Sequence, residues 1–195
     1  MRIAVIDYNA GNIRSVYYAL QRLGYEADVT RDPDRILAAD KVIFPGVGEA
    51  STTMNFLHKY ELSSLIPTLT QPVLGICLGM QLMCIHSEEG NTDCLGIIPA
   101  RVKRFVPENG EKVPHMGWNE LYDWKGSIFA SLPENPYVYF VHSYYVEMNP
   151  WNVASCNYVH PFSAAVQKDN FYATQFHLEK SGVVGESILR AFLQD

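Results

Sequence analysis

The sequence predicts an α/β protein in which a mostly parallel central sheet is flanked by helices, with additional antiparallel or mixed strands in the second half. Two observations lead to this fold class. In the first half, short apolar segments alternate with segments whose apolar residues recur at helical spacing, which is typical of strand–helix units in a parallel sheet. From 100 to 174 the apolar segments are short, rich in aromatic residues and broken by Pro, Gly and Asn, which favours antiparallel pairing.

The first half contains short apolar runs over 2–6, 41–44 and 72–76 that are expected to form strands, and 26–30 is expected to form a further strand. A polar turn is expected over 7–11. Asn12 is a suitable N-cap for a helix that ends near Gly24. Its helically spaced apolar residues are Ile13, Val16, Tyr17, Leu20 and Leu23. A further helix is expected to begin at Cys77 and to continue past Cys84 towards Glu89.

The second half should add strands over 137–141, 153–156 and 163–167, followed by a last strand over 171–176. A final helix is expected where one face carries Val184, Ile188, Leu189 and Phe192. The length of 195 residues suits one well-buried core and is short for two. We therefore expect residues 1–195 to form a single domain.

The composition is that of an ordinary globular protein, with 48% hydrophobic and 18% charged residues. The net charge of −6 and the lack of any Lys/Arg run argue against nucleic acid or anionic membranes as partners. No segment resembles a signal peptide or reaches transmembrane length, so we expect a cytoplasmic protein with reduced thiols. The cysteines form no C-x-x-C pair and no zinc-like spacing, and we expect no metal and no organic cofactor.

The segment 75–79 has the form G-x-C-x-G at the junction of a predicted strand and helix. This is the cysteine version of a nucleophile elbow, in which a tight turn lifts the reactive side chain above the sheet edge. The flanking glycines remove side chains that would clash in the turn, and the helix N-terminus favours the thiolate. An isolated cysteine is more often a buried core residue, but this context makes Cys77 the candidate nucleophile.

His177 is the candidate general acid and base, because it ends the last predicted strand. In an extended chain residues i and i+2 point to the same side, so Glu179 is able to orient the imidazole. Strand ends gather at one edge of an open α/β sheet, which brings Cys77 and His177 together. The alternative is an exposed His–Glu surface pair.

A tetrahedral oxyanion would need backbone N–H donors. Leu78 follows the nucleophile and provides one, and the segment containing Gly46, Val47 and Gly48 is expected to provide another, although such a segment is more commonly a simple strand-ending turn. Gln81 lies one helical turn beyond the nucleophile. Glu89 offers a carboxylate for a ligand ammonium, unless it belongs to a solvated acidic helix end.

Three motifs occur in order: P-G-V-G at 45–48, G-I-C-L-G-M-Q at 75–81 and Q-F-H-L-E-K-S at 175–181. Together they resemble the class I (triad) glutamine amidotransferases. Over nearly the whole length the chain is similar to the glutaminase subunits of imidazole glycerol phosphate synthase. That narrower similarity rests on 11–16 (G-N-I-R-S-V), 113–119 (V-P-H-M-G-W-N) and 139–144 (Y-F-V-H-S-Y).

This resemblance implies a glutamine amidotransferase type 1 domain over 1–195 and a glutaminase reaction with glutamine as the substrate. It also implies a heterodimer with a (β/α)8-barrel cyclase, which would use the ammonia in histidine biosynthesis to form imidazole glycerol phosphate and aminoimidazole carboxamide ribotide. The matching substrate-contact positions are Gly46, Gly48, Gln81, Glu89, Ser143 and Tyr144. The positions that match the cyclase-facing surface are Asn12, Trp118, Tyr139 and Lys180.

Two residues depart from the family pattern: Leu178 replaces a usual Pro and Tyr172 a common Gly. Neither removes a functional group from the triad. Two other interpretations remain open. One is a related amidotransferase that feeds a different barrel synthase, for example in the amidation of a surface sugar. The other is a catalytically silent scaffold, against which the intact Cys–His–Glu set argues.

Overall fold

The computed structural model describes residues 1–8 and 11–195, so the turn predicted over 7–11 lies partly outside the described residues. Five parallel strands form the centre of the main sheet in the order β2-β1-β3-β4-β13. Their bounds are β1 (Ile3–Ile6), β2 (Ala27–Thr30), β3 (Lys41–Phe44), β4 (Val73–Ile76) and β13 (Phe171–Thr174). The strands predicted for this part of the sheet are therefore present.

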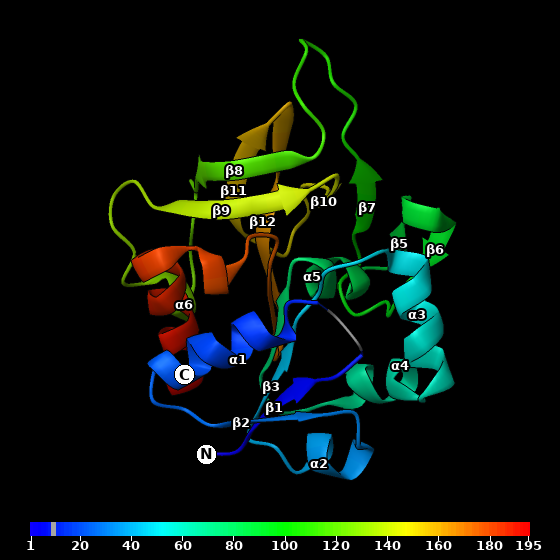
Figure 1. Cartoon of the computed structure of the whole chain (residues 1–195). Coiled ribbons are helices and arrows are strands. Elements are labelled where there is room, and N and C mark those ends of the chain that lie inside the picture. The colour runs from blue at the N-terminus through cyan, green and yellow to red at the C-terminus, as the bar shows by residue number, and fades with distance from the viewer. Residues whose placement is uncertain (9–10) are drawn as a thin grey trace.

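The main sheet continues beyond β13 through β12, β10, β7, β5 and β6, with mostly antiparallel pairing, while β11 pairs with β12. A separate two-stranded sheet, β8–β9, lies across the upper end of the central strands in Figure 1. The bounds are β5 (His86–Ser87), β6 (Thr92–Asp93), β7 (Arg101–Arg104), β8 (His115–Glu120), β9 (Tyr137–His142), β10 (Tyr144–Val146), β11 (Asn152–Tyr158) and β12 (His160–Lys168). The mixed second half thus agrees with the predicted fold class.

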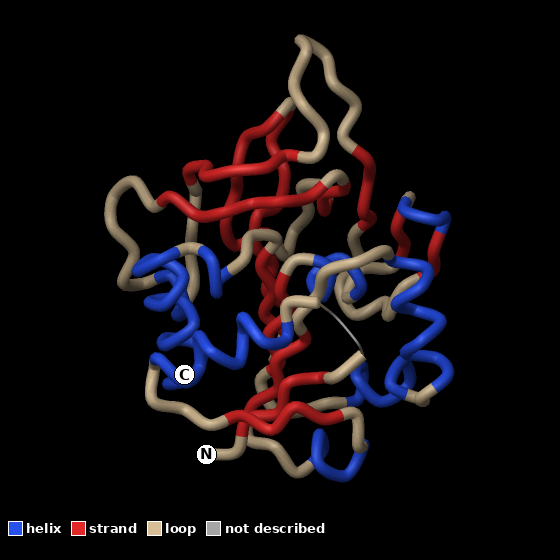
Figure 2. Tube along the Cα trace, viewed as in Figure 1, coloured by secondary structure: helices blue, strands red, loops and turns tan. Residues whose placement is uncertain are grey.

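Helices cover both faces of the central strands, as Figure 2 shows. On one face α1 (Ile13–Arg22) and α6 (Gly182–Gln194) pack against Ile3 and Val5 of β1. On the other face α2 (Pro33–Leu37), α3 (Ala50–Lys59), α4 (Leu62–Leu65) and α5 (Leu78–Leu82) pack against Ala4 and Ile6. Because alternate residues of β1 enter two different cores, the strand must be apolar throughout.

The remaining helical segments are 3₁₀ turns: η1 (Ile66–Thr68), η2 (Glu89–Asn91), η3 (Ser127–Phe129) and η4 (Leu178–Lys180). Within the described residues, no helix is both long and apolar enough to cross a lipid bilayer.

The long helix predicted from Cys77 towards Glu89 is wrong. Helix α5 ends at Leu82, and the chain then enters β5, where His86 and Ser87 pair with β7. Glu89 lies in η2, and the buried Cys84 lies beyond the helix. Pairing with β7 overrides the local helical pattern.

Candidate active site

Cys77 occupies a strained turn between β4 and α5. Its backbone has φ 54° and ψ −107°, which a side-chain-bearing residue rarely adopts. The glycines on either side permit this turn: a Cβ at Gly79 would lie 2.0 Å from the Phe44 carbonyl oxygen, and one at Gly75 would lie 3.0 Å from backbone atoms of α5. The predicted elbow geometry is therefore present, with Cys77 at the carboxyl end of a central strand.

His177 and Glu179 form a buried pair, with 2.7 Å between Nδ1 and Oε1 and side chains that are 0% and 1% exposed. This burial excludes the exposed surface pair. The predicted contact is present, but the extended chain invoked for it is not, because Glu179 lies in the 3₁₀ turn η4. The Asn12 side chain donates to the same carboxylate oxygen at 3.2 Å.

The electrostatics of this pair favour an imidazolium beside a carboxylate. Burial alone lowers the pKa of His177, but the nearby Cys77 sulfur and the Glu179 carboxylate outweigh it and raise the pKa to about 10. Burial alone raises the pKa of Glu179, but the hydrogen bond and charge of His177 hold it below its usual value. Among residues 1–8 and 11–195, Nε2 of His177 has no hydrogen-bond partner. This nitrogen is thus available to exchange protons with the sulfur or a ligand.

A cavity of about 320 Å³ opens beside the sulfur. Its lining includes the predicted positions Gly48, Gln81, Glu89, Ser143 and Tyr144. Sequence reasoning missed further lining residues from the hairpin side of the cavity, which are Pro114, Val141 and His142.

The predicted oxyanion segment presents a carbonyl in this structure. The Leu78 N–H donates to the Gly46 oxygen at 3.3 Å, and the Tyr8 hydroxyl donates to the neighbouring Pro45 oxygen at 2.5 Å. The Leu78 donor is therefore already engaged. Val47 and Gly48 line the cavity next to it, and in this conformation the Gly46 carbonyl occupies the Leu78 N–H that an oxyanion would need.

Glu89 is half-buried and accepts a hydrogen bond from the Ala50 N–H at 2.8 Å. Burial raises the pKa of Glu89, the Ala50 hydrogen bond opposes that rise, and the nearby Glu49 carboxylate adds to it. Glu89 lines the cavity and is not part of a helix end, so the alternative of a solvated acidic helix end does not hold for it.

Three of the predicted partner-facing residues lie together at the surface. Trp118 is 55% exposed, its ring contacts that of Tyr139 edge-on with centroids 6.0 Å apart, and Lys180 Nζ lies 5.9 Å from the Tyr139 ring centroid. Asn12 differs from the prediction because its side chain is buried against Glu179. Asn12 is connected to this surface through Glu179, whose chain neighbour Lys180 lies beside Tyr139.

The backbone of β9 is tied to the segment that carries His177. The His177 N–H donates to the Tyr139 carbonyl at 3.0 Å, and the Tyr139 N–H donates to Ser181 Oγ at 3.0 Å. The Ser181 hydroxyl donates in turn to the His177 carbonyl at 2.6 Å. A closed ring of hydrogen bonds therefore joins the strand with the exposed aromatic residues to the catalytic-site segment.

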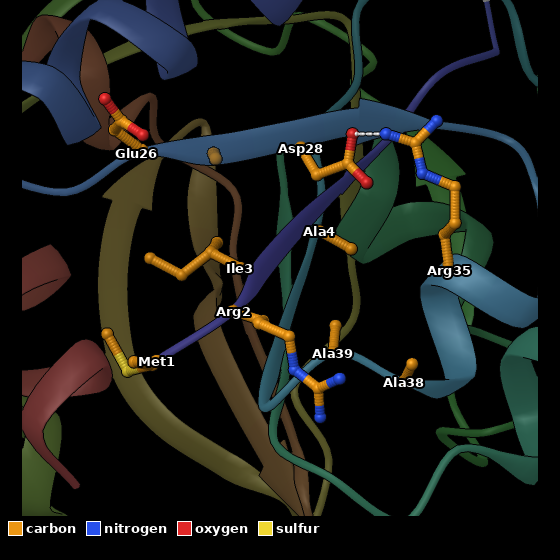
Figure 3. Close-up of a pocket in the computed structure, with 10 residues that line it drawn as sticks. Met1, Arg2, Ile3, Ala4, Glu26, Asp28, Arg35, Ala38 and Ala39 are labelled. Carbon is orange, nitrogen blue, oxygen red and sulfur yellow. Dashed lines mark hydrogen bonds and ion pairs between the residues drawn. The ribbon is translucent and has the colours of Figure 1, made fainter.

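A larger hollow of about 510 Å³ lies at the opposite end of the strands, around the start of β1 (Figure 3). Two of its charged side chains form ion pairs with opposite charges: Arg35 with Asp28, as Figure 3 shows, and Arg2 with Asp40. Figure 3 shows no nucleophile or acid–base pair there. The smaller cavity beside Cys77 is therefore the candidate active site.

Comparison with known proteins agrees with this geometry. Residues 4–195 match the family "Glutamine amidotransferase class-I". The chain is 61% identical over 194 residues to "Imidazole glycerol phosphate synthase subunit HisH" of Bacteroides thetaiotaomicron, covering 99% of both chains. It is 50% identical to the protein of the same name from Escherichia coli K12, covering 100% of both.

Among solved structures, a chain of PurLQS from Thermotoga maritima has the same fold, with a TM-score of 0.74 at 17% identity over 99% of this chain and 97% of that one. The chain therefore belongs to the class-I glutamine amidotransferases and, within them, to the HisH subunits of imidazole glycerol phosphate synthase.

Proposed function

We propose that this chain hydrolyses the side-chain amide of glutamine to glutamate and ammonia, with Cys77 as nucleophile, His177 as general acid and base and Glu179 as the orienting carboxylate. The observation that carries the proposal is the strained turn that places the Cys77 sulfur on the cavity wall, near enough to the buried His177–Glu179 pair to raise the pKa of His177. Membership of the amidotransferase family supports glutamine as the substrate.

The reaction follows from these positions. The Cys77 sulfur attacks the amide carbon, and the carbonyl oxygen becomes an oxyanion that needs N–H donors from Leu78 and the 46–48 segment. His177 gives its Nε2 proton to the amide nitrogen, which leaves as ammonia. The acyl group then remains bound to Cys77 as a thioester. Water, deprotonated by His177, then attacks the thioester, releasing glutamate and restoring the sulfur. Glu179 holds the imidazole in one orientation throughout both halves of the reaction.

The cavity wall suits the free amino-acid part of glutamine. We place the α-ammonium group next to the half-buried Glu89 carboxylate. Gln81 uses both amide hydrogens inside the protein, on the Tyr144 carbonyl and the Gln175 side chain. Its Oε1 is therefore the end that remains to accept a hydrogen bond from the substrate. Ser143 and Gly48 complete the predicted contacts.

The ammonia is proposed to pass to a cyclase subunit with a (β/α)8 barrel in a heterodimer, forming imidazole glycerol phosphate and aminoimidazole carboxamide ribotide. The relatives are named as a subunit of imidazole glycerol phosphate synthase, which supports a partner chain. The surface around Trp118, Tyr139 and Lys180 is the proposed docking surface, since Trp and Tyr side chains are frequent anchors of interfaces. In the alternative interpretation, a related amidotransferase, the ammonia would pass to a different barrel synthase instead of this cyclase.

The test is Cys77→Ser in the complex with the candidate cyclase. Glutamine-dependent synthesis should be abolished, while synthesis from added ammonium salts should persist because that step bypasses the thiol. Cys94→Ser is the matched control, since Cys94 lies outside the cavity lining. Near-normal glutamine turnover by Cys77→Ser would show that the nucleophile is assigned wrongly. Lack of ammonia transfer with this cyclase would favour a different synthase.

A further inference from the structure

Gln175 contacts the reactive sulfur but has no part in the mechanism described above. It directly follows β13, and its side chain is fully buried. Its Nε2 lies 3.6 Å from Cys77 Sγ, and its Oε1 lies 2.9 Å from Gln81 Nε2. The amide thus bridges the nucleophile and a residue of the cavity wall.

The two ends of an amide have nearly the same shape, so which end faces the sulfur has to be settled by its neighbours. The Tyr144 carbonyl can only accept a hydrogen bond. The atom of the Gln81 amide that lies 2.8 Å from it must therefore be the nitrogen, Nε2. That nitrogen has a second hydrogen, which it donates to Gln175. The atom of Gln175 next to Gln81 is then the oxygen, and the N–H end faces Cys77.

The Tyr144 carbonyl also accepts a hydrogen bond from a second donor, His142, in addition to the one from Gln81. His142 Nδ1 lies 2.8 Å from the Tyr144 oxygen and must carry the proton there. His142 Nε2 consequently accepts from His115 Nδ1 at 3.0 Å. Burial lowers the pKa of both histidines, to about 3 for His142 and about 4 for His115, so both are neutral at pH 7.

Two hydrogen-bond contacts of the sulfur act in opposite directions. The Val141 carbonyl, 4.0 Å away, accepts from the thiol and would repel a thiolate. The Gln175 N–H donates, and a donor binds a charged acceptor more strongly than a neutral one. Helix α5, only five residues long, adds few aligned peptide dipoles behind the sulfur.

We infer that Gln175 is a further catalytic residue, whose side-chain N–H stabilises the thiolate form of Cys77 and is held in that orientation by Gln81 and the Tyr144 carbonyl. The inference rests on the proposed role of Cys77 and adds the group that makes its thiolate available for attack. Gln175 moves no proton itself; the proton transfers of the proposed reaction belong to His177.

The experiment measures alkylation of Cys77 by iodoacetamide as a function of pH, resolved by mass spectrometry of the peptide, so that the other cysteines do not contribute. Gln175→Glu keeps an oxygen for Gln81 and replaces the donor, while Gln175→Met removes both ends. In each variant the midpoint of alkylation should rise by about one pH unit or more, which is about tenfold less thiolate below the midpoint.

A second variant leaves Gln175 in place and replaces the hydrogen-bond donor of Gln81 that faces it with an acceptor. In Gln81→Glu a protonated carboxyl still donates to the Tyr144 carbonyl, but its other oxygen accepts from Gln175. The amide of Gln175 should then turn its oxygen to the sulfur, and the alkylation midpoint should again rise. Thr174→Val is the matched control, because Thr174 is buried next to Gln175 and hydrogen-bonds the Phe176 carbonyl rather than the sulfur. Its midpoint should equal that of the unmodified chain.

A purely structural role for Gln175 would lower the melting temperature and leave the midpoint of Gln175→Met unchanged, whereas Gln175→Glu raises the midpoint through its charge in any case. Unchanged midpoints in both Gln175→Met and Gln81→Glu would overturn the inference. The two proposals fail separately: if Cys77→Ser abolishes glutamine turnover while these midpoints stay constant, only the role of Gln175 is refuted. If Cys77→Ser remains active, the proposed function fails whatever the midpoints are.

Discussion

The 46–48 segment should control the rate of glutamine hydrolysis, because the Gly46 carbonyl now accepts from the Leu78 N–H at 3.3 Å. Rotation of the peptide between Gly46 and Val47 would withdraw that oxygen and turn the Val47 N–H towards the same site. The rotation breaks one hydrogen bond, about 1 kcal/mol. A missing oxyanion donor costs roughly 10²–10³ in turnover. We therefore expect the isolated chain to be slower than the activated complex by at least this factor.

Val47→Pro tests the switch directly, because proline has no N–H to present after the rotation. It should keep the low rate of the isolated chain and lose the stimulation of about 10²–10³ in the complex. Val47→Ala is the matched control: it keeps the N–H and should respond to the cyclase almost as the unmodified chain does.

The assay measures glutamine hydrolysis by the isolated chain, by the heterodimer and by the heterodimer with cyclase ligand. It is carried out for the unmodified chain, Val47→Pro and Val47→Ala. Ammonium-dependent synthesis and co-purification show that the proline variant still folds and binds. Rates that agree within a factor of about two across the three states, less than half a kcal/mol, would refute the switch. So would equal stimulation of the proline and alanine variants.

Glu179→Gln should lower kcat/KM for glutamine in the complex by roughly 10²–10⁴, because it removes the charge that supports the His177 imidazolium; unchanged turnover would exclude Glu179 as the orienting acid. Gly79→Ala should lower the free energy of unfolding by about 1–3 kcal/mol in urea titrations, since its Cβ would lie 2.0 Å from the Phe44 oxygen, and a wild-type midpoint would contradict the close packing of the elbow. Stability should be greatest near pH 6.5: protonation of the buried His142, with its lowered pKa, favours unfolding as pH falls from 6.5 towards 3, and the raised pKa of His177 makes stability fall as pH rises from 6.5 towards 10. Urea unfolding at pH 5, 6.5 and 9 checks this, and a steady increase from pH 5 to 9 would disprove it.

Strands β1, β3, β4 and β13 were predictable because they are fully buried and mostly apolar, whereas the edge strand β2 is partly exposed; the bounds of β3 equal those expected. Helix α3 was missed because Ser51, Thr52 and Thr53 in its first turn are weak helix formers. It forms with the help of Glu49, whose carboxylate caps the Ser51 and Thr52 N–H groups. Glu49 can be identified as a capping residue in the sequence only after a helix has been assigned to the segment that follows it.

The site was predictable where a local motif fixes the geometry and not where the contacts are long-range. The glycines at 75 and 79 predicted the strained turn at Cys77. Spacing alone indicated the His177–Glu179 contact, yet for an extended chain that is not present. Gln175 carried a signal, since it opens the motif that contains His177, but its contact with the sulfur depends on an orientation imposed from β10, about thirty residues away.

The hydrogen-bonded ring between β9 and the His177 segment has a mechanical consequence. Because the His177 N–H donates directly to the Tyr139 carbonyl, and the Ser181 hydroxyl links the Tyr139 N–H to the His177 carbonyl, a docked partner that displaces β9 displaces the backbone of His177 with it. Side chains on the outer face are then free to diversify for different partners while the linkage is inherited intact. Truncating Trp118 would weaken docking yet leave the transmission of movement in place.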